Sequence, residues 1–266
     1  MSILQAIVLG IIQGLTEFLP ISSTAHLVIV PWFLHWPDPS KAFDIALHIG
    51  TLLALLIYFW KDLVEVLRAK DKRMVWLIVA GCVPLPLAQI AEKKAGAFSD
   101  PHVTPWAPLL IAGCLIGFAV LLKISDTVGR KKREAEKMSI ADAIFVGVGQ
   151  VIAAVFPGAS RSGTTMTFAL FTGLTREAAV RFSFLLSVPT IAAVALYSTV
   201  KHHHELASAP GGVTPLLAGI VASAIVGYLA IAFLMDYVKR KSMDVFFWYR
   251  IVAGLAIIAA WYAYRA

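Results

Sequence analysis

Long apolar runs separated by short polar loops make up most of the chain. Six of these runs are about as long as a helix that crosses a bilayer, and charged or Pro/Gly-rich loops bound each of them. The pattern therefore predicts six transmembrane helices, at residues 42–60, 74–92, 106–123, 178–200, 213–235 and 246–264. No hydrophilic segment is long enough to form a second domain, so we expect one membrane domain over residues 1–266.

Two further apolar segments, residues 3–35 and 139–174, are each interrupted midway by proline, hydroxyl residues and a basic side chain. A backbone break at membrane depth is tolerated only where protein or a water-filled cavity satisfies the freed polar groups. We interpret both segments as re-entrant hairpins, each a helix, a loop and a second helix. The expected fold is an all-α integral membrane protein with six transmembrane helices and two re-entrant helix–loop–helix hairpins.

Composition agrees with a membrane protein, and the charge pattern predicts its orientation. Of the 266 residues 59% are hydrophobic and 15% are charged, with a mean hydropathy of +0.79. The net charge of +7 could indicate nucleic-acid binding, but the Lys and Arg residues concentrate in loops 61–73, 123–138 and 236–245. The predicted spans place these loops on one side, which the positive-inside rule makes cytoplasmic. We expect both termini outside and no nucleic-acid partner.

The two interrupted segments resemble one another. "AIVLGIIQGLTEFLPISS" (6–23) aligns with "AIFVGVGQVIAAVFPGAS" (143–160), 137 residues later, with identities that include Gln13/Gln150, Pro20/Pro157 and Ser23/Ser160. Three spans between the hairpins reverse their direction, so the pattern predicts an inverted-topology repeat, with repeat 1 at about 1–123 and repeat 2 at about 139–266. In such folds the two broken helices build the site near the membrane midplane.

The first hairpin places a carboxylate next to a helix break. Gln13 and Glu17 share a helix face, Pro20 ends that helix, and Ser22 or Ser23 can cap the next one, whose N-terminus attracts anions. The alternative is a kinked helix with a stray carboxylate. Ionisable residues inside membranes are functional more often than not, which favours a site.

The second hairpin carries "PGASRSGTT" (157–165), with Arg161 as a permanent cation in a segment otherwise without charge. A guanidinium binds phosphate oxygens bidentately, and neighbouring hydroxyls and glycines can add contacts. The alternative is that Arg161 pairs with Glu17 only to neutralise both charges. That alternative leaves the surplus of hydroxyl groups unexplained, so we predict a phosphate site.

The motifs "QGLTEFLPISSTAH" and "PGASRSGTT" closely resemble those of the undecaprenyl-diphosphate phosphatases of bacterial membranes, the bacitracin-resistance family. The resemblance covers essentially the whole chain, including the spacing between the motifs. The first family signature is Glu or Gln followed by Glu four positions later, which Gln13 and Glu17 match. Many members have Glu at the first position, so Glu17 must here carry the acid–base or metal function. The family's His falls on His26, and its Pro-Gly-x-Ser-Arg-Ser signature falls on residues 157–162.

The resemblance implies hydrolysis of a C55 polyprenyl diphosphate to the monophosphate, on the outer face of the bacterial plasma membrane, which recycles the carrier of cell-wall precursors and confers resistance to bacitracin. The nucleophile is either the Ser23 hydroxyl, activated by His26 or Glu17, or a water activated by the same groups. A divalent cation, Mg²⁺ or Ca²⁺, is expected on Glu17 and Gln13. The residues expected to bind the phosphates are Ser22, Thr24, Ser160, Arg161, Ser162, Gly163 and Thr165.

Other interpretations stay open at this point. Inverted repeats with broken helices also build transporters, so the same site could belong to a lipid-phosphate flippase or an anion transporter. Asp44 and His48 are either partners of the site or ordinary capping and packing residues. The patterns "GIIQG" (10–14) and "GCLIG" (113–117) predict close helix packing. The expected partners are the lipid substrate and membrane lipids, and a homodimer is left open.

Overall fold

The computed structural model describes the chain except residues 38, 71, 89, 91–103, 202–211 and 264–266. The described part is helical, with one isolated bridge between Arg133 and Leu174. Its helices are α1 (Ile3–Phe18), α2 (Ser23–Leu34), α3 (Lys41–Tyr58), α4 (Trp60–Arg68), α5 (Arg73–Cys82), α7 (Ala107–Val128), the 3₁₀ turn η2 (Ala135–Lys137), α8 (Ile140–Val155), α9 (Arg161–Phe171), α10 (Arg176–Lys201), α12 (Val213–Arg240) and α13 (Asp244–Ala263).

The all-helical membrane class is confirmed for the described residues. Four helices, α7, α10, α12 and α13, are long and apolar enough to cross a bilayer. A fifth candidate is the pair α3–α4, which bends by 67° at Phe59. The predicted span 74–92 begins as a shorter apolar helix, and its last residues lie outside the described part of the chain. The count of six transmembrane helices therefore stays a prediction.

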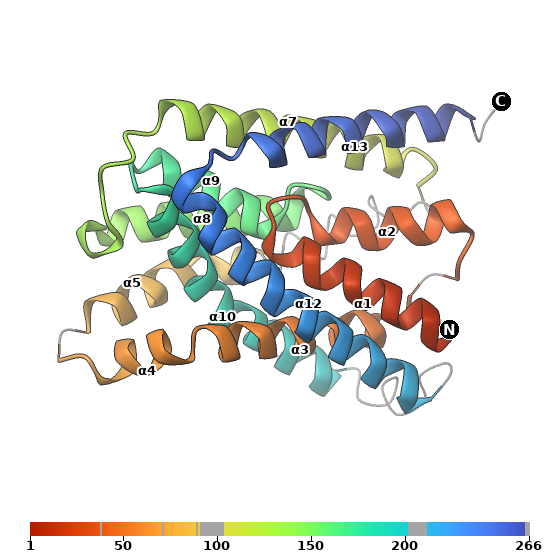
Figure 1. The fold of residues 1–266 in the computed structure, drawn as a ribbon, viewed down its shortest axis with the longest axis horizontal. Helices are drawn as coiled ribbons and strands as arrows, with labels where there is room; N and C mark the ends of the chain where they lie inside the picture. Colours follow the sequence, from red (N-terminus) through yellow and green to blue (C-terminus); the bar gives the residue numbers. More distant parts are fainter. Residues whose placement is uncertain (38, 71, 89, 91–103, 202–211, 264–266) are drawn as a thin grey trace.

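The helices lie roughly along the long axis of the molecule (Figure 1). Helices α7 and α13 run side by side along one edge, α12 crosses the view diagonally, and α1 packs along α12. Helix α1 begins and helix α13 ends at one end of the long axis, and the connections α4–α5 and α12–α13 lie toward the other end (Figure 1). Two of the three basic loops, at 61–73 and 236–245, belong to these connections, and the side of the membrane that the loops face stays a prediction.

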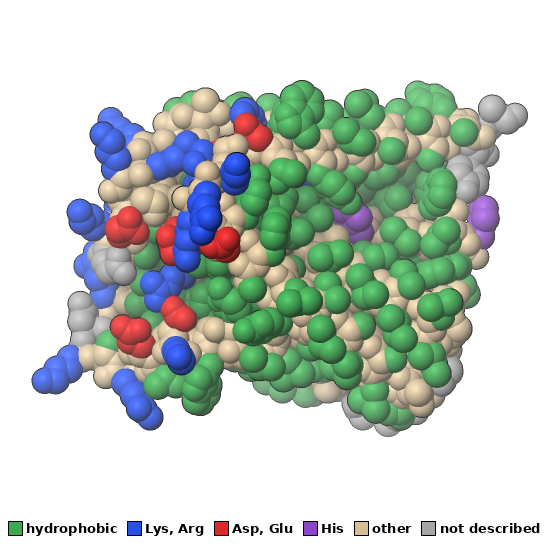
Figure 2. Space-filling view, in the orientation of Figure 1, with side chains coloured by type: hydrophobic (Ala, Val, Ile, Leu, Met, Phe, Trp, Pro, Cys, Tyr) green, Lys and Arg blue, Asp and Glu red, His purple; other side chains and the backbone are tan. Residues whose placement is uncertain are grey.

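The surface separates charge from apolar side chains in the same way. Figure 2 shows Lys and Arg side chains gathered at one end of the molecule, while hydrophobic side chains cover the rest of this face. Large apolar residues on several helices are widely exposed, for example Leu4 at 70% and Leu196 at 69%. A water-soluble protein rarely exposes apolar side chains over so wide an area, so this surface is suited to lipid.

Both interrupted segments fold as two helices joined by a short turn, with Pro20 and Pro157 in the turns. The first helices, α1 and α8, each have 16 residues. Each begins with a capping box, formed by Ser2 and Gln5 in α1 and by Ser139 and Asp142 in α8. Equal lengths and equal caps, 137 residues apart, explain why the sequences of the two segments align.

Small residues set how closely α1 approaches α12. A Cβ atom added at Gly10 would lie 2.7 Å from the Gly219 carbonyl oxygen, and one at Gly14 would lie 2.7 Å from the Gly227 nitrogen. Substitution at either position would push the helices apart, so the close packing predicted for residues 10–14 is confirmed. The same interpretation was wrong for the second pattern, because a Cβ at Gly113 or Gly117 meets nothing within 4 Å among the described residues.

Candidate active site

The second helix of each hairpin begins at a serine with an unusual backbone. Ser22 (φ +78°) caps α2 and Ser160 (φ +72°) caps α9, and such positive φ values are uncommon outside glycine. Each serine hydroxyl accepts a hydrogen bond from a backbone N–H three residues on, in Ala25 and Gly163. Strain at matched positions of both turns marks them as candidate functional backbone.

The two caps also correct the register of the sequence comparison. The alignment paired Ser23 with Ser160, but the structure makes Ser22 the counterpart of Ser160, because the second turn is one residue longer. The hydroxyl contacts agree: Ser22 Oγ lies 3.1 Å from Thr24 Oγ1, and Ser160 Oγ lies 3.1 Å from Ser162 Oγ. Ser23 therefore occupies in hairpin 1 the position that Arg161 occupies in hairpin 2.

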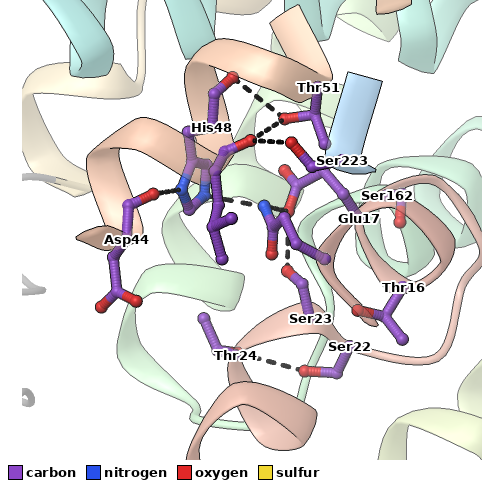
Figure 3. Close-up of polar contacts among 12 residues, drawn as sticks. Thr16, Glu17, Ser22, Ser23, Thr24, Asp44, His48, Thr51, Ser162 and Ser223 are labelled. Atoms are coloured by element: carbon purple, nitrogen blue, oxygen red, sulfur yellow. Dashed lines mark hydrogen bonds and ion pairs between the residues drawn. The ribbon is translucent and has the colours of Figure 1, made fainter. Parts of the chain in front are cut away.

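Glu17 is the centre of a buried polar cluster (Figure 3). Its side chain lies near the end of α1 with 7% of the residue surface exposed. Its Oε2 accepts hydrogen bonds from Ser23 Oγ at 2.7 Å and from Gln13 Nε2 at 3.1 Å, and it lies 3.8 Å from His48 Nε2. A hydroxyl donating to a buried carboxylate is the arrangement that a base-activated nucleophile requires.

Two buried polar atoms in this region have no hydrogen-bond partner among the described residues: Gln13 Oε1 and Arg161 Nη1. An ionised carboxylate can only accept, so Gln13 must turn its amide nitrogen toward Glu17 and its oxygen away. No ion pair within 4 Å joins Arg161 to Glu17 among the described residues. The mere neutralising pair is thus not found. An acceptor and a donor remain free for a ligand.

Most of the other hydroxyls predicted to bind phosphate make internal contacts. Ser162 Oγ donates to the Leu19 carbonyl of the opposite turn at 3.3 Å. The Thr165 hydroxyl lies 2.9 Å from the Arg161 carbonyl oxygen, to which it donates. These contacts brace the two turns, as the capping hydroxyls of Ser22 and Ser160 also do. Phosphate binding by these hydroxyls, by Thr24 and by Gly163 stays a prediction.

His26 is engaged on both ring nitrogens. Its Nδ1 lies 2.7 Å from the Ser22 carbonyl oxygen, so Nδ1 carries the proton and donates, and its Nε2 lies 2.7 Å from Tyr249 Oη. With Nδ1 protonated in a neutral ring, the Tyr249 hydroxyl donates to Nε2. Neither nitrogen contacts Ser23. Of the two bases considered for Ser23, the geometry therefore favours Glu17, while His26 links α2 to α13.

The side-chain oxygens of Glu17 and Gln13 are of the type that Mg²⁺ and Ca²⁺ prefer, and cation binding here stays a prediction. Among the described residues, no three His, Cys, Asp or Glu side chains are grouped so that they could hold a metal ion. Mg²⁺ is often held by one or two carboxylates together with substrate phosphates and water. Glu17 supplies a carboxylate, and the free Gln13 Oε1 supplies a second buried oxygen that has no other described partner.

The comparison with known families decides the relationship. Residues 6–256 match the family described as bacitracin resistance protein BacA. The chain belongs to this family. It is 43% identical to a protein named undecaprenyl-diphosphatase from Moorella thermoacetica, over all of both chains. It is 42% identical to the protein of that name from Geobacter metallireducens, with 97% of this chain and 98% of the relative covered. It is 43% identical to that from Geotalea daltonii, with the same coverage.

Within this BacA-family chain, the structure adds two residues to the region that the sequence did not indicate, Arg250 and Tyr249, and a third, His48, whose role the sequence left open. Arg250, on α13, is fully buried and contacts both turns. Tyr249 contacts His26. His48 had been weighed and left open, and it now lies beside Glu17, with its Nδ1 donating to the Asp44 carbonyl. A lone arginine inside an apolar span is the signal that could have identified Arg250.

Proposed function

We propose that the protein is an undecaprenyl-diphosphate phosphatase, which hydrolyses the C55 lipid diphosphate to the monophosphate and inorganic phosphate. Two observations support the proposal: the hydrogen bond from Ser23 Oγ to the buried Glu17 carboxylate, and the buried Nη1 of Arg161, which has no hydrogen-bond partner among the described residues. The names of the relatives support the same reaction. Release of this carrier lipid for cell-wall synthesis accounts for resistance to bacitracin, as expected of the family.

Ser23 and Glu17 carry the chemistry in this proposal. Glu17 Oε2 takes the proton of Ser23 Oγ as that oxygen forms a bond to the terminal phosphorus. The bond from phosphorus to the bridging oxygen breaks, and its electron pair leaves with the lipid monophosphate. Water then hydrolyses the phosphoserine. In the alternative, Glu17 activates a water that attacks the phosphorus directly. The 2.7 Å contact between Ser23 and Glu17 favours the covalent route.

Arg161 stabilises the charge that develops on the phosphoryl oxygens. Phosphoryl transfer depends mainly on positioning and on preorganised charge, which the partly buried Arg161 guanidinium supplies. The N-terminal N–H groups of α2 and α9 add a favourable field for an anion, because both helices begin at the turns. Of these helix ends, α9 also carries the guanidinium, so we assign the diphosphate headgroup mainly to hairpin 2.

Glu17 and Gln13 would hold the divalent cation, together with oxygens of the diphosphate. When bound, the cation neutralises phosphate charge and makes the terminal phosphorus more electrophilic. Gln13 contributes a neutral oxygen where many relatives are expected to have a carboxylate. Cation binding by this chain therefore depends on substrate phosphates more than on the protein's own charge.

The wider architecture proposed is the inverted repeat in the bacterial plasma membrane, with six spans and both hairpins re-entrant. Helices of the first half have counterparts in the second half at similar sequence offsets: α1 corresponds to α8, and α7 corresponds to α13. The basic end of the molecule is assigned to the cytoplasm (Figure 2). Both termini then face outside, and the headgroup enters from the outer leaflet while the prenyl chain stays among membrane lipids. A homodimer is compatible with this arrangement.

The test is phosphate release from a polyprenyl diphosphate by the purified protein in lipid-supplemented detergent, with Mg²⁺ or Ca²⁺ added or chelated. We expect cation-dependent release that is lost in Glu17→Ala and in Arg161→Ala. Glu65→Ala and Arg68→Ala are the matched controls, because both side chains are exposed on α4, and they should keep wild-type rates. No release by folded wild-type protein would contradict the proposal and favour transport of a lipid phosphate.

A further inference from the structure

Arg250 is a fully buried cation on α13, in the interior of a helix apolar enough to span the membrane. None of the ion pairs among the described residues includes it, so no carboxylate balances its charge there. A buried charge without an opposite charge is costly unless several hydrogen bonds compensate it. Such a residue needs an explanation within the fold or the reaction.

The guanidinium of Arg250 is hydrogen-bonded to both hairpin turns at once. Its Nη1 donates to the Pro20 carbonyl of turn 1 at 3.2 Å, and its Nη2 donates to the Gly158 and Ala159 carbonyls of turn 2 at 3.0 and 3.2 Å. Its Nε donates to the Leu115 carbonyl of α7 at 3.0 Å. These turn carbonyls lie where a helix is broken, and the fork of guanidinium donors satisfies them together.

The same guanidinium explains a glycine of the second motif. A Cβ atom at Gly163 would lie 3.1 Å from Arg250 Nη1 and 3.1 Å from Ser160 Cβ. Gly163 was expected to let backbone N–H groups approach a phosphate. The structure gives a different reason for a glycine at position 163. The Arg250 side chain packs against the first turn of α9, which begins at Arg161, and leaves little room for a Cβ atom there.

We propose that Arg250 is a positioning residue that fixes the two turns relative to each other, and so aligns Ser23 and Glu17 of hairpin 1 with Arg161 of hairpin 2. This inference rests on the proposed phosphatase function. The residues following Pro20 and Ala159 in the chain are the caps and the first residues of α2 and α9, so a shift of these carbonyls displaces the reacting groups. Misplacement by about 1 Å can lower a rate by about a hundredfold.

The test compares kcat and KM for a polyprenyl diphosphate in Arg250→Lys, Arg250→Met and Gly163→Ala, using monodisperse protein with a cooperative thermal transition. Arg250→Lys keeps the charge but loses the fork of donors. We expect kcat to fall by about 10- to 100-fold in both Arg250 variants, with KM changed by less than about threefold, because alignment matters most in the transition state. Trp261→Phe, which removes a single bond from the same helix to the Pro105 carbonyl, should leave kcat within about twofold.

A double variant separates positioning from a general loss of packing. Gly163→Ala displaces the same guanidinium, so its effect and that of Arg250→Lys should not multiply when combined. Multiplying effects, or folded Arg250 variants with wild-type kcat, would overturn the proposal. If the Arg250 variants do not fold, Gly163→Ala decides alone: an unchanged kcat overturns the proposal, and a fall supports it. Failure of the phosphatase assignment is distinct, because wild-type protein would then release no phosphate.

Discussion

Hairpins 1 and 2 share one backbone design and carry opposite chemistry. Both begin with a capping box and a 16-residue helix, and both turn into a second helix at a serine with positive φ. Hairpin 1 then presents a carboxylate and a hydroxyl, Glu17 and Ser23, whereas hairpin 2 presents a guanidinium at the position equivalent to Ser23. The shared backbone places both sets of side chains, and in the proposed mechanism hairpin 1 attacks the phosphorus while hairpin 2 binds the phosphates.

Gln13 and Gln150, at equivalent positions of α1 and α8, also share a backbone position but differ in their contacts. Gln13 donates to Glu17 and keeps a free oxygen, so it belongs to the site. Gln150, 137 residues later, donates to the Gly81 carbonyl at 3.1 Å and accepts from Thr190 at 2.9 Å. Both polar atoms of the Gln150 amide are thus hydrogen-bonded, and they join α8 to α5 and α10. At these equivalent positions, Gln150 joins three helices, whereas Gln13 contacts Glu17 and keeps an oxygen without a partner among the described residues.

The largest effect should come from removing the base of hairpin 1. Glu17→Gln keeps the size of the side chain but cannot accept a proton from Ser23, so we expect kcat to fall by about a thousandfold. Phosphate release per folded molecule measures this. Retention of more than about a tenth of the wild-type rate would show that Glu17 is not the base.

A smaller loss should follow from replacing the cation of hairpin 2. Arg161→Lys keeps the charge but loses the planar pair of donors, so we expect kcat to fall by about a hundredfold and KM to rise. Steady-state kinetics over a range of substrate concentrations check this. Equal rates for Arg161→Lys and wild type would show that only the positive charge of Arg161 matters, and not its planar pair of donors. Equal rates for Arg161→Ala and wild type would remove it from the site.

Exchanging the neutral oxygen of Gln13 for a carboxylate should change the cation response. In Gln13→Glu two carboxylates share the site, and a divalent cation relieves their repulsion. We expect half-maximal activation at about tenfold lower Mg²⁺ or Ca²⁺ than in wild type, which titration of activity against free cation measures. Gln150→Glu is the matched control, and its cation response should equal that of wild type.

The smallest effect on turnover is expected at Gln150, the packing partner in the comparison. Gln150→Leu leaves the buried Gly81 carbonyl without its donor, which costs about 1–3 kcal/mol in the free energy of unfolding. Thermal unfolding in detergent should show the lower stability, while kcat stays within about threefold. A hundredfold loss of kcat in folded Gln150→Leu would show that Gln150, like Gln13, is needed for turnover, and would contradict a role in packing alone.

Much of the frame could be predicted from the sequence, because apolar run length and proline position act locally. Proline disfavours the interior of a helix, and the predicted breaks at Pro20 and Pro157 both lie in turns of the structure. The register between the hairpins was off by one, since turn length depends on how the turns pack and not on local pattern. Arg250 was missed because its role lies in carbonyls more than 90 positions away, at Pro20 and Gly158, which only the fold brings together.

Candidate chemistry was predictable as residue types, but not as pairings. Glu17 and Arg161 stood out as charges in apolar segments. The choice between His26 and Glu17 as the partner of Ser23 required geometry, because His26 follows Ser23 within one helical turn and yet its ring is turned to Ser22 and Tyr249. Sequence spacing gives the face of a helix, whereas hydrogen bonds decide which atoms meet.

The central claim is that Ser23 of hairpin 1 attacks the phosphorus while Arg161 of hairpin 2 binds the phosphates. It is tested most directly by trapping a phosphorylated Ser23. A polyprenyl diphosphate labelled with ³²P in its terminal phosphate would be mixed with Arg161→Lys, in which turnover is slowed, and the reaction quenched with acid. Peptide mapping should place the label on Ser23, and Ser23→Ala should neither become labelled nor release phosphate above the background rate. Near-normal release by Ser23→Ala, with no label on the protein, would contradict the account and assign the attack to water.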